Sequence, residues 1–113
     1  MAWALLAGRA TGQDVHFFRH FHMADGLPDR EVNRVVEDAL GFIWVGTNDG
    51  LARFDGREWL VFRHRQSDPG SVCGNTITAL VAGQEPGCVW VGTGDGHLCR
   101  WSPDRQAFEQ FPL

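Results

Sequence analysis

Two residue types are absent from this sequence of 113 residues, which contains no lysine and no tyrosine. Without lysine, the chain lacks the phosphate-binding lysine of a P-loop, the ATP-positioning lysine of a protein kinase and any lysine that could form a Schiff base. Serine is scarce as well, and none of the three serines lies in a nucleophile elbow. No pair of acidic residues has a spacing that indicates general acid-base catalysis. We therefore predict that this chain is not an enzyme.

The sequence also has a deficit of positive charge and lacks long apolar runs. The net charge is −4, so the sequence does not indicate nucleic-acid binding, and 43% hydrophobic residues are typical of a globular chain. Residues 1–12, MAWALLAGRATG, are small and apolar but too few for a transmembrane helix. They are either the remnant of a secretory signal peptide or a disordered terminus. A signal peptide predicts an extracytoplasmic protein.

What the sequence does contain is an internal repeat. The stretch WVGTNDG, from Trp44 to Gly50, returns as WVGTGDG from Trp90 to Gly96, 46 residues later. Each copy combines a short β-branched and aromatic run with Asn, Asp and Gly, which favour tight hairpin turns. The positions that define the repeat are Trp44, Gly46, Thr47, Gly50, Trp90, Gly92, Thr93 and Gly96.

The same alternation of apolar runs and turn residues predicts four antiparallel strands in each copy. They are 32–37, 42–47, 51–54 and 59–62 in the first copy, and 77–81, 88–93, 97–101 and 108–111 in the second. Four-stranded units repeated at this spacing are typical of β-propeller blades. We predict an all-β chain with a terminal segment at 1–12, an N-terminal strand and loop at 13–31, and two four-stranded antiparallel blades at 32–63 and 64–113.

Two blades are fewer than a closed propeller or a stable repeat array requires. The chain is therefore either a piece of a longer protein or a unit that assembles with copies of itself. Its expected partners are the remaining propeller blades or those copies. No cofactor and no metal ion are expected.

Several short motifs of the first copy resemble those of a known protein family. They are Asp25-Gly-Leu-Pro28, Asp38-x-x-Gly41, Trp44-Val-Gly-Thr47 and Gly50-Leu-Ala-Arg-Phe-Asp-Gly56, and the second copy adds Asp68-Pro-Gly-Ser71, Asn75-x-Ile77 and Trp90-Val-Gly-Thr93. This pattern resembles the two-component regulator propeller repeat, found in the extracytoplasmic sensor region of bacterial hybrid histidine kinases. The resemblance implies a bacterial sensor module in the periplasm, or otherwise outside the cytoplasm. Such a module binds a ligand, a carbohydrate among the candidates, and signals to a kinase or cyclase domain that is expected outside this chain.

Ligand contacts in a propeller are expected on the loops that lead into the innermost strands, because these loops gather near the axis on one face. Here they are residues 23–31 and 65–75. Asp, Asn and Ser at such places also make turns, which is the competing interpretation of every candidate. The candidate ligand-binding residues are Asp29, Arg30, Asn33, Asp68, Ser71 and Asn75.

The histidines and cysteines give weaker indications, of a metal site and of a disulfide respectively. His20 and His22 are two residues apart and could share a strand face, but no third metal ligand is evident, and His16, His64 and His97 are scattered. If Thr93 pairs with Gly96, then Cys88 faces Trp101 and Cys99 faces Trp90, so the two cysteines are diagonal neighbours. We therefore expect no disulfide, with Cys73 as the most accessible thiol.

Two other functions stay open. One is a fragment of a propeller enzyme, because Asp38-x-x-Gly-x-x-Trp44 faintly resembles the Asp-box of sialidase propellers, and lyases also use this scaffold. The other is a structural pair of blades that self-assembles through its open β edges without a specific ligand.

Overall fold

The computed structural model describes residues 26–112, which contain two four-stranded antiparallel sheets. The first sheet, blade 1, consists of β1 (Val32–Glu37), β2 (Ile43–Thr47), β3 (Gly50–Phe54) and β4 (Trp59–Phe62). Blade 2 consists of β5 (Ile77–Ala82), β6 (Val89–Thr93), β7 (Leu98–Ser102) and β8 (Ala107–Phe111). The predicted all-β fold with two four-stranded blades is confirmed. The expected terminal segment 1–12, and residues 13–25 of the expected N-terminal strand and loop, lie outside the described residues.

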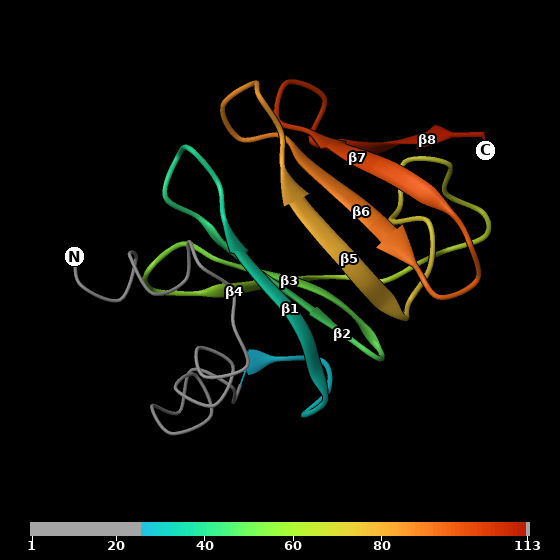
Figure 1. Ribbon diagram of the computed structural model, residues 1–113, viewed down its shortest axis with the longest axis horizontal. Helices are drawn as coiled ribbons and strands as arrows, with labels where there is room; N and C mark the ends of the chain where they lie inside the picture. The colour runs from blue at the N-terminus through green and yellow to red at the C-terminus, as the bar shows by residue number, and fades with distance from the viewer. Residues whose placement is uncertain (1–25, 113) are drawn as a thin grey trace.

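Within each blade the strands pair in the order in which they follow along the chain. β5 contacts both β1 and β2, and the two blades cross with β1 and β5 side by side (Figure 1). β4 and β8 are the outermost strands. This is the arrangement of neighbouring propeller blades, whose first strands lie innermost.

The two blades have the same cross-strand register. Val36 pairs with Trp44 and Trp44 with Arg53 in blade 1, and the corresponding residues of blade 2, Val81, Trp90 and Arg100, pair in the same way. The first strand of each blade also has one irregularity after its first residue, at Val32 and at Ile77. Position 53 is therefore equivalent to position 100.

The core lies between the blades and is rich in aromatic rings. Trp44 is fully buried, its ring stacks on Phe62 at 5.7 Å between centroids, and it lies 5.8 Å from Trp101. Phe62 also contacts the ring of Phe108 edge-on at 5.3 Å. Tilted and edge-on pairs of this kind add about 0.5–1.5 kcal/mol each to the stabilisation from burial. Aromatic packing thus joins the two sheets.

Close approach of the blades also requires a glycine in β2. A Cβ atom added at Gly46 would lie 2.5 Å from Cγ2 of Ile77 in β5, which is closer than two carbon atoms can pack. The absence of a side chain at position 46 therefore lets β5 pack on β2.

Asp38 organises the turn between β1 and β2. Its Oδ1 accepts hydrogen bonds from the backbone N–H groups of Leu40 (2.9 Å) and Phe42 (3.1 Å), and its Oδ2 accepts one from the indole Nε1 of Trp44 (2.8 Å). The Asp38 side chain is buried. The structure of the turn therefore accounts for the Asp38-x-x-Gly-x-x-Trp44 pattern, because Asp38 binds the turn backbone and the indole of Trp44.

We expect Asp38→Ala to lower the free energy of unfolding by about 3 kcal/mol, because the indole and two backbone donors lose a charged acceptor in a buried turn. Urea denaturation measures the change. The matched control is Glu85→Ala in the corresponding turn of blade 2, where Glu85 is exposed, and it should change stability by less than about 0.5 kcal/mol. Equal effects of the two substitutions would contradict this role of Asp38.

Candidate functional site

One face of the molecule consists of the loops and turns at the ends where β1 and β5 begin, and we call it the loop face. Hydrogen bonds connect its parts: Asn48 N–H donates to Glu31 C=O (3.3 Å), Gly50 N–H to Asn75 C=O (2.6 Å) and Gly94 N–H to Thr76 C=O (2.9 Å). The last of these closes the start of β5 onto the β6–β7 turn. The loop face is therefore one connected layer that spans both blades.

Two of the predicted ligand-binding residues lie where the blades meet. Asn33 donates from Nδ2 to Asn48 Oδ1 (2.8 Å) and to the backbone carbonyl of Ile77 (3.0 Å), so one amide ties β1 to the first hairpin and to β5. Asn75 accepts a hydrogen bond from His64 N–H at its Oδ1 (2.8 Å). Both amides have a structural function at the junction.

The other candidates lie in local turns. Asp29 Oδ1 accepts from Glu31 N–H (2.9 Å), and Asp68 Oδ1 accepts from Gly70 N–H (2.9 Å). The Ser71 hydroxyl donates to the carbonyl of Asp68 (2.8 Å).

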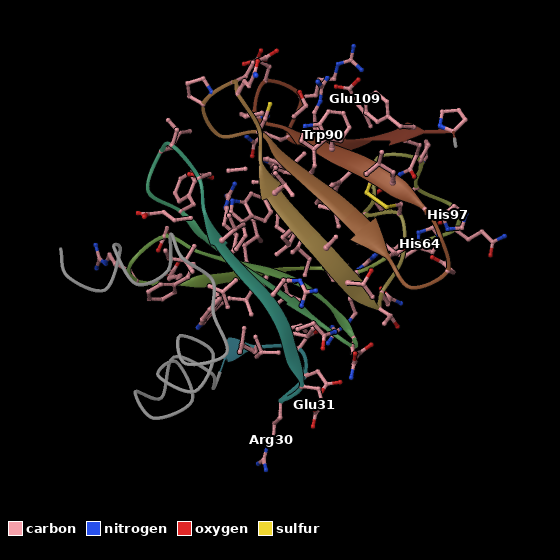
Figure 2. All side chains as sticks on the ribbon, in the orientation of Figure 1. Arg30, Glu31, His64, Trp90, His97 and Glu109 are labelled. Carbon is pink, nitrogen blue, oxygen red and sulfur yellow. A yellow bond between two sulfur atoms is a disulfide. The ribbon has the colours of Figure 1, made fainter. Side chains whose placement is uncertain are left out.

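The turn that holds Asp68 and Ser71 lies against the outermost strand of blade 2, because Gln110 of β8 donates from Nε2 to Ser71 C=O (3.0 Å). Arg30 lies two residues before β1, is exposed and extends away from that turn (Figure 2). The six predicted residues therefore do not form a single cluster.

A hollow of about 420 Å³ lies on the loop face of blade 2, and we call it the histidine hollow. A second hollow of about 380 Å³, lined by Asn75, Thr76, Gly94 and Asp95, adjoins it through Asp95. Of the predicted residues, Asp68 lines the first hollow and Asn75 the second. The histidine hollow is lined by His64, Arg65, Gln66, Asp68, Pro69, Cys73, Asp95, His97 and Gln110.

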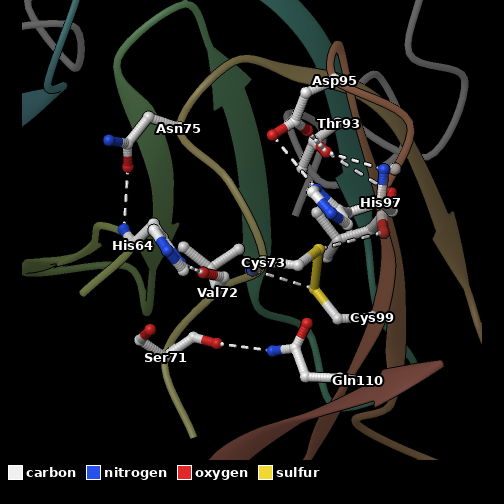
Figure 3. The surroundings of a disulfide bond; sticks show 12 residues. His64, Ser71, Val72, Cys73, Asn75, Thr93, Asp95, His97, Cys99 and Gln110 are labelled. Carbon is white, nitrogen blue, oxygen red and sulfur yellow. Dashed lines mark hydrogen bonds and ion pairs between the residues drawn. A yellow bond between two sulfur atoms is a disulfide. The ribbon is translucent and has the colours of Figure 1, made fainter. Parts of the chain in front are cut away.

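In both histidines of this hollow, Nδ1 has a partner within the protein. His64 Nδ1 lies 2.8 Å from the carbonyl of Val72, which can only accept, so this nitrogen carries the proton (Figure 3). His97 Nδ1 lies 3.1 Å from Asp95 Oδ2. Each ring therefore keeps Nε2 for other interactions, as an acceptor when the ring is neutral and as a donor when it is charged.

Asp95 is the acidic residue that lines both hollows. The hydroxyl of Thr93 donates to its Oδ1, and this bond, followed by the interaction with His97, holds the pKa of Asp95 below its usual range. The carboxylate is therefore charged at neutral pH. It is an acceptor beside the His97 imidazole, and the same lining includes His64 and Gln110, so the hollow offers both donors and acceptors to a ligand rich in hydroxyl groups.

His64, Asp95 and His97 were not predicted as a group. Asp95 and His97 belong to one hairpin turn, but His64 is more than 30 positions earlier in the sequence, and only the path of residues 63–76 brings it there. No group of three or more His, Cys, Asp or Glu side chains that could hold a metal ion is found within residues 26–112. His16, His20 and His22 lie outside that range. No helix in the same range is long and apolar enough to cross a membrane.

A disulfide joins Cys73 to Cys99 beneath the histidine hollow, with 5.9 Å between the Cα atoms (Figure 3). This corrects the expectation of three unpaired cysteines. It also corrects the accessibility of Cys73, which is buried, as is the free Cys88. Burial raises the pKa of the Cys88 thiol.

The expected register of the β6–β7 hairpin was also wrong by one residue. Cys99 faces Val91 and Trp101 faces Val89, because Thr93 N–H donates to the carbonyl of His97 and the turn is one residue longer than in blade 1. The disulfide partner of Cys99 lies on neither hairpin strand. It comes from the segment that connects the blades.

With this geometry established, residues 26–49 match the family model described as Two component regulator propeller. This stretch of the chain is similar to one two-component regulator propeller repeat. The matched residues cover the loop before β1, β1 itself, the Asp38 turn, β2 and the first hairpin turn. The resemblance inferred from the residues is thereby confirmed.

Two longer proteins are similar to this propeller chain. Histidine kinase P4 from Formosa agariphila is 35% identical over 71 residues, which are 62% of this chain and 5% of that protein. The crystal structure of the extracellular domain of a hybrid two component system from B. thetaiotaomicron aligns with a TM-score of 0.68 and 24% identity, over 79% of this chain and 12% of that chain. The structural likeness supports the propeller fold. The chain thus spans a small part of either relative.

Removal of the disulfide should lower the free energy of unfolding by about 3 kcal/mol, since it closes a loop with a sequence separation of 26 residues. Urea denaturation with and without a thiol reductant measures this. A variant with both Cys73→Ala and Cys99→Ala should already be destabilised and should not respond to the reductant. An equal response of this variant and the parent chain would show that the effect has another origin.

Proposed function

We propose that this chain is part of an extracytoplasmic, ligand-sensing β-propeller of a two-component signal transduction protein. The observation that carries the proposal is the match of residues 26–49 to the two-component regulator propeller. Its supports are the similar stretch of a histidine kinase and the fold shared with an extracellular domain of a hybrid two component system. The catalytic output, a kinase or a cyclase, belongs to another part of the protein.

The Cys73–Cys99 disulfide supports the extracytoplasmic location. Disulfides persist in oxidising compartments, such as the bacterial periplasm, and are rare in the reducing cytosol. This one is buried and closes a long loop, which fits a structural bond. The disulfide therefore supports an oxidising, extracytoplasmic compartment, and we propose that this compartment is the bacterial periplasm.

The histidine hollow and the adjoining hollow are the proposed ligand site. Their linings combine donors and acceptors of both charge signs, including Arg65, Asp95, His97 and Gln110. A polyhydroxylated ligand, such as a carbohydrate, uses such a mixture because each hydroxyl both donates and accepts. Of the six residues predicted from sequence, Asp68 and Asn75 belong to this site, and the ligand contacts of the other four stay a prediction.

A ligand in these hollows would act on the contact between the blades. It would touch the connecting segment through His64 and the β6–β7 turn through Asp95 and His97. The same segment is bonded to blade 1 through Asn75 and Gly50, and to β7 through the disulfide. Binding energy that differs between two arrangements of the blades would then shift their populations, which is how a signal could leave the site.

Calorimetric titration with neutral and uronate oligosaccharides tests the proposal. We expect one class to bind, and His97→Ala to weaken it at least about tenfold, which is about 1.4 kcal/mol. The matched control is Gln84→Ala, an exposed residue in the turn between β5 and β6, and its affinity should equal that of the parent chain. No binding of either class, or equal loss in both variants, would argue against this site.

A further inference from the structure

The turn between β6 and β7 carries a histidine at the position where the equivalent turn of blade 1 has a glycine. In blade 1, Gly50 pairs with Thr47 at the end of the hairpin, and in blade 2 the N–H of Thr93 donates to the carbonyl of His97 at 3.0 Å. The hairpin of blade 1 therefore closes without a side chain at this position. It follows that the hairpin of blade 2 does not need the His97 imidazole for its backbone pairing.

In each blade the aspartate of this turn has a basic side chain as its partner, but the two basic residues differ. Asp49 Oδ2 lies 3.6 Å from the NH2 group of Arg63, whereas Asp95 Oδ2 lies 3.1 Å from Nδ1 of His97. Pro112 stands at the position of blade 2 that is equivalent to Arg63, directly after the outermost strand. Arginine is charged at every physiological pH, whereas histidine gains and loses its charge near neutral pH. Blade 2 thus has a titratable partner where blade 1 has a permanent cation.

Several hydrogen-bond donors of the histidine hollow are not used within the protein. Arg65 is exposed, and its guanidinium has no hydrogen bond or ion pair with any of residues 26–112. Gln110 uses one of its two amide hydrogens on the carbonyl of Ser71. His64 and His97 both bond through Nδ1, so each Nε2 is a further donor whenever its ring is charged (Figure 3). The hollow can therefore bind an acceptor, and anionic groups are the strongest acceptors.

The two carboxylates of the same hollow already have donors of their own. Asp68 Oδ1 accepts from the N–H of Gly70 at 2.9 Å. Asp95 accepts from the hydroxyl of Thr93, and this bond, followed by the interaction with His97, holds the pKa of Asp95 below its usual range. Asp95 therefore keeps its charge while the pH falls through the range in which histidines become charged. A charged His97 then neutralises Asp95, and an anionic ligand meets less repulsion.

From these observations we propose that the histidine hollow selects an acidic saccharide, whose carboxylate or sulfate group is bound by the charged His97 ring and the Arg65 guanidinium. Where the ring is neutral, binding adds a proton from the solvent to Nε2, because Nδ1 already carries the proton that it donates to Asp95. The proposal rests on the proposed function for the ligand site itself, and it adds the class of ligand and the uptake of a proton. The charged and titratable groups that face this ring across the hollow are Asp95, His64, Arg65 and Asp68, and β8 adds the uncharged amide of Gln110.

Calorimetric titration with pairs of acidic and neutral oligosaccharides tests the proposal. Uronate oligosaccharides are compared with their methyl esters, and sulfated oligosaccharides with their desulfated forms, so each pair differs only in the charged group. We expect an acidic form to bind at least about tenfold more tightly than its neutral form at about pH 6, and this ratio to fall as the pH rises to about 8. Titration in buffers with different enthalpies of protonation should show net proton uptake with the acidic form and none with the neutral form.

Three substitutions of exposed residues separate the two cationic groups. His97→Gln keeps an amide donor but cannot gain a charge, so it should lower the affinity for the acidic form and reduce the proton uptake. Arg65→Ala should lower that affinity at every pH and leave the proton uptake in place. The matched control is Arg105→Ala, in the turn between β7 and β8 at the other end of the blade, and its affinity should equal that of the parent chain. Unchanged midpoints of urea denaturation show that the variants are folded.

The outcomes distinguish this proposal from the proposed function. Tighter binding of the uronates or of the sulfated series supports it and identifies the anionic group. Equal affinity for acidic and neutral forms, without proton uptake, overturns it and leaves the ligand site of the proposed function in place. Binding of neither form overturns both. A preference for the acidic form that survives both His97→Gln and Arg65→Ala would place the anionic group elsewhere and also overturn the proposal.

Discussion

The contact of the Trp44 ring with Phe62 and Trp101 is the interaction on which the rest of the molecule depends. Each blade is a sheet of short strands that could not bury its apolar side chains alone, and this layer of rings gives both sheets a common core. Asp38 fixes the indole from one side, and Gly46 lets β5 come close on the other. The geometry of the loop face depends on this contact, because its loops and turns join strands that the rings hold in place.

Most of the fold could be predicted from the sequence because both copies of the repeat carry the same pattern of strands and turns. Two copies of a strand and turn pattern place eight strands to within one residue, and each copy supports the interpretation of the other. The hairpin register of blade 2 was wrong because a turn length is decided by backbone hydrogen bonds, here between Thr93 and His97, and not by the spacing of Gly and Asp. The disulfide was missed for a related reason. Cys73 reaches Cys99 only through the path of a connecting segment, which carries no strand periodicity.

The candidate site was predictable as a region but not as a set of residues. Loops that lead into the first strands do form one face, and Asn33 and Asn75 lie where the blades meet. Their amides, however, satisfy backbone groups, as polar residues in turns often do. His64 and His97 come together because the segment 63–76 first passes β8 before it enters β5. No local pattern encodes such a detour, since it depends on which side chains fill the space between two sheets.

The bond between Cys73 and Cys99 makes a covalent ring of the chain between them, and this ring contains β5, β6 and the start of β7. A single break of the backbone inside the ring would leave both pieces attached to each other through the sulfur atoms. The strands that pack against blade 1 would then stay at high effective concentration beside their partners, even after proteolysis of an exposed turn such as 94–96. The bond would thus act as a tether that preserves the sheet after a protease has cut this turn.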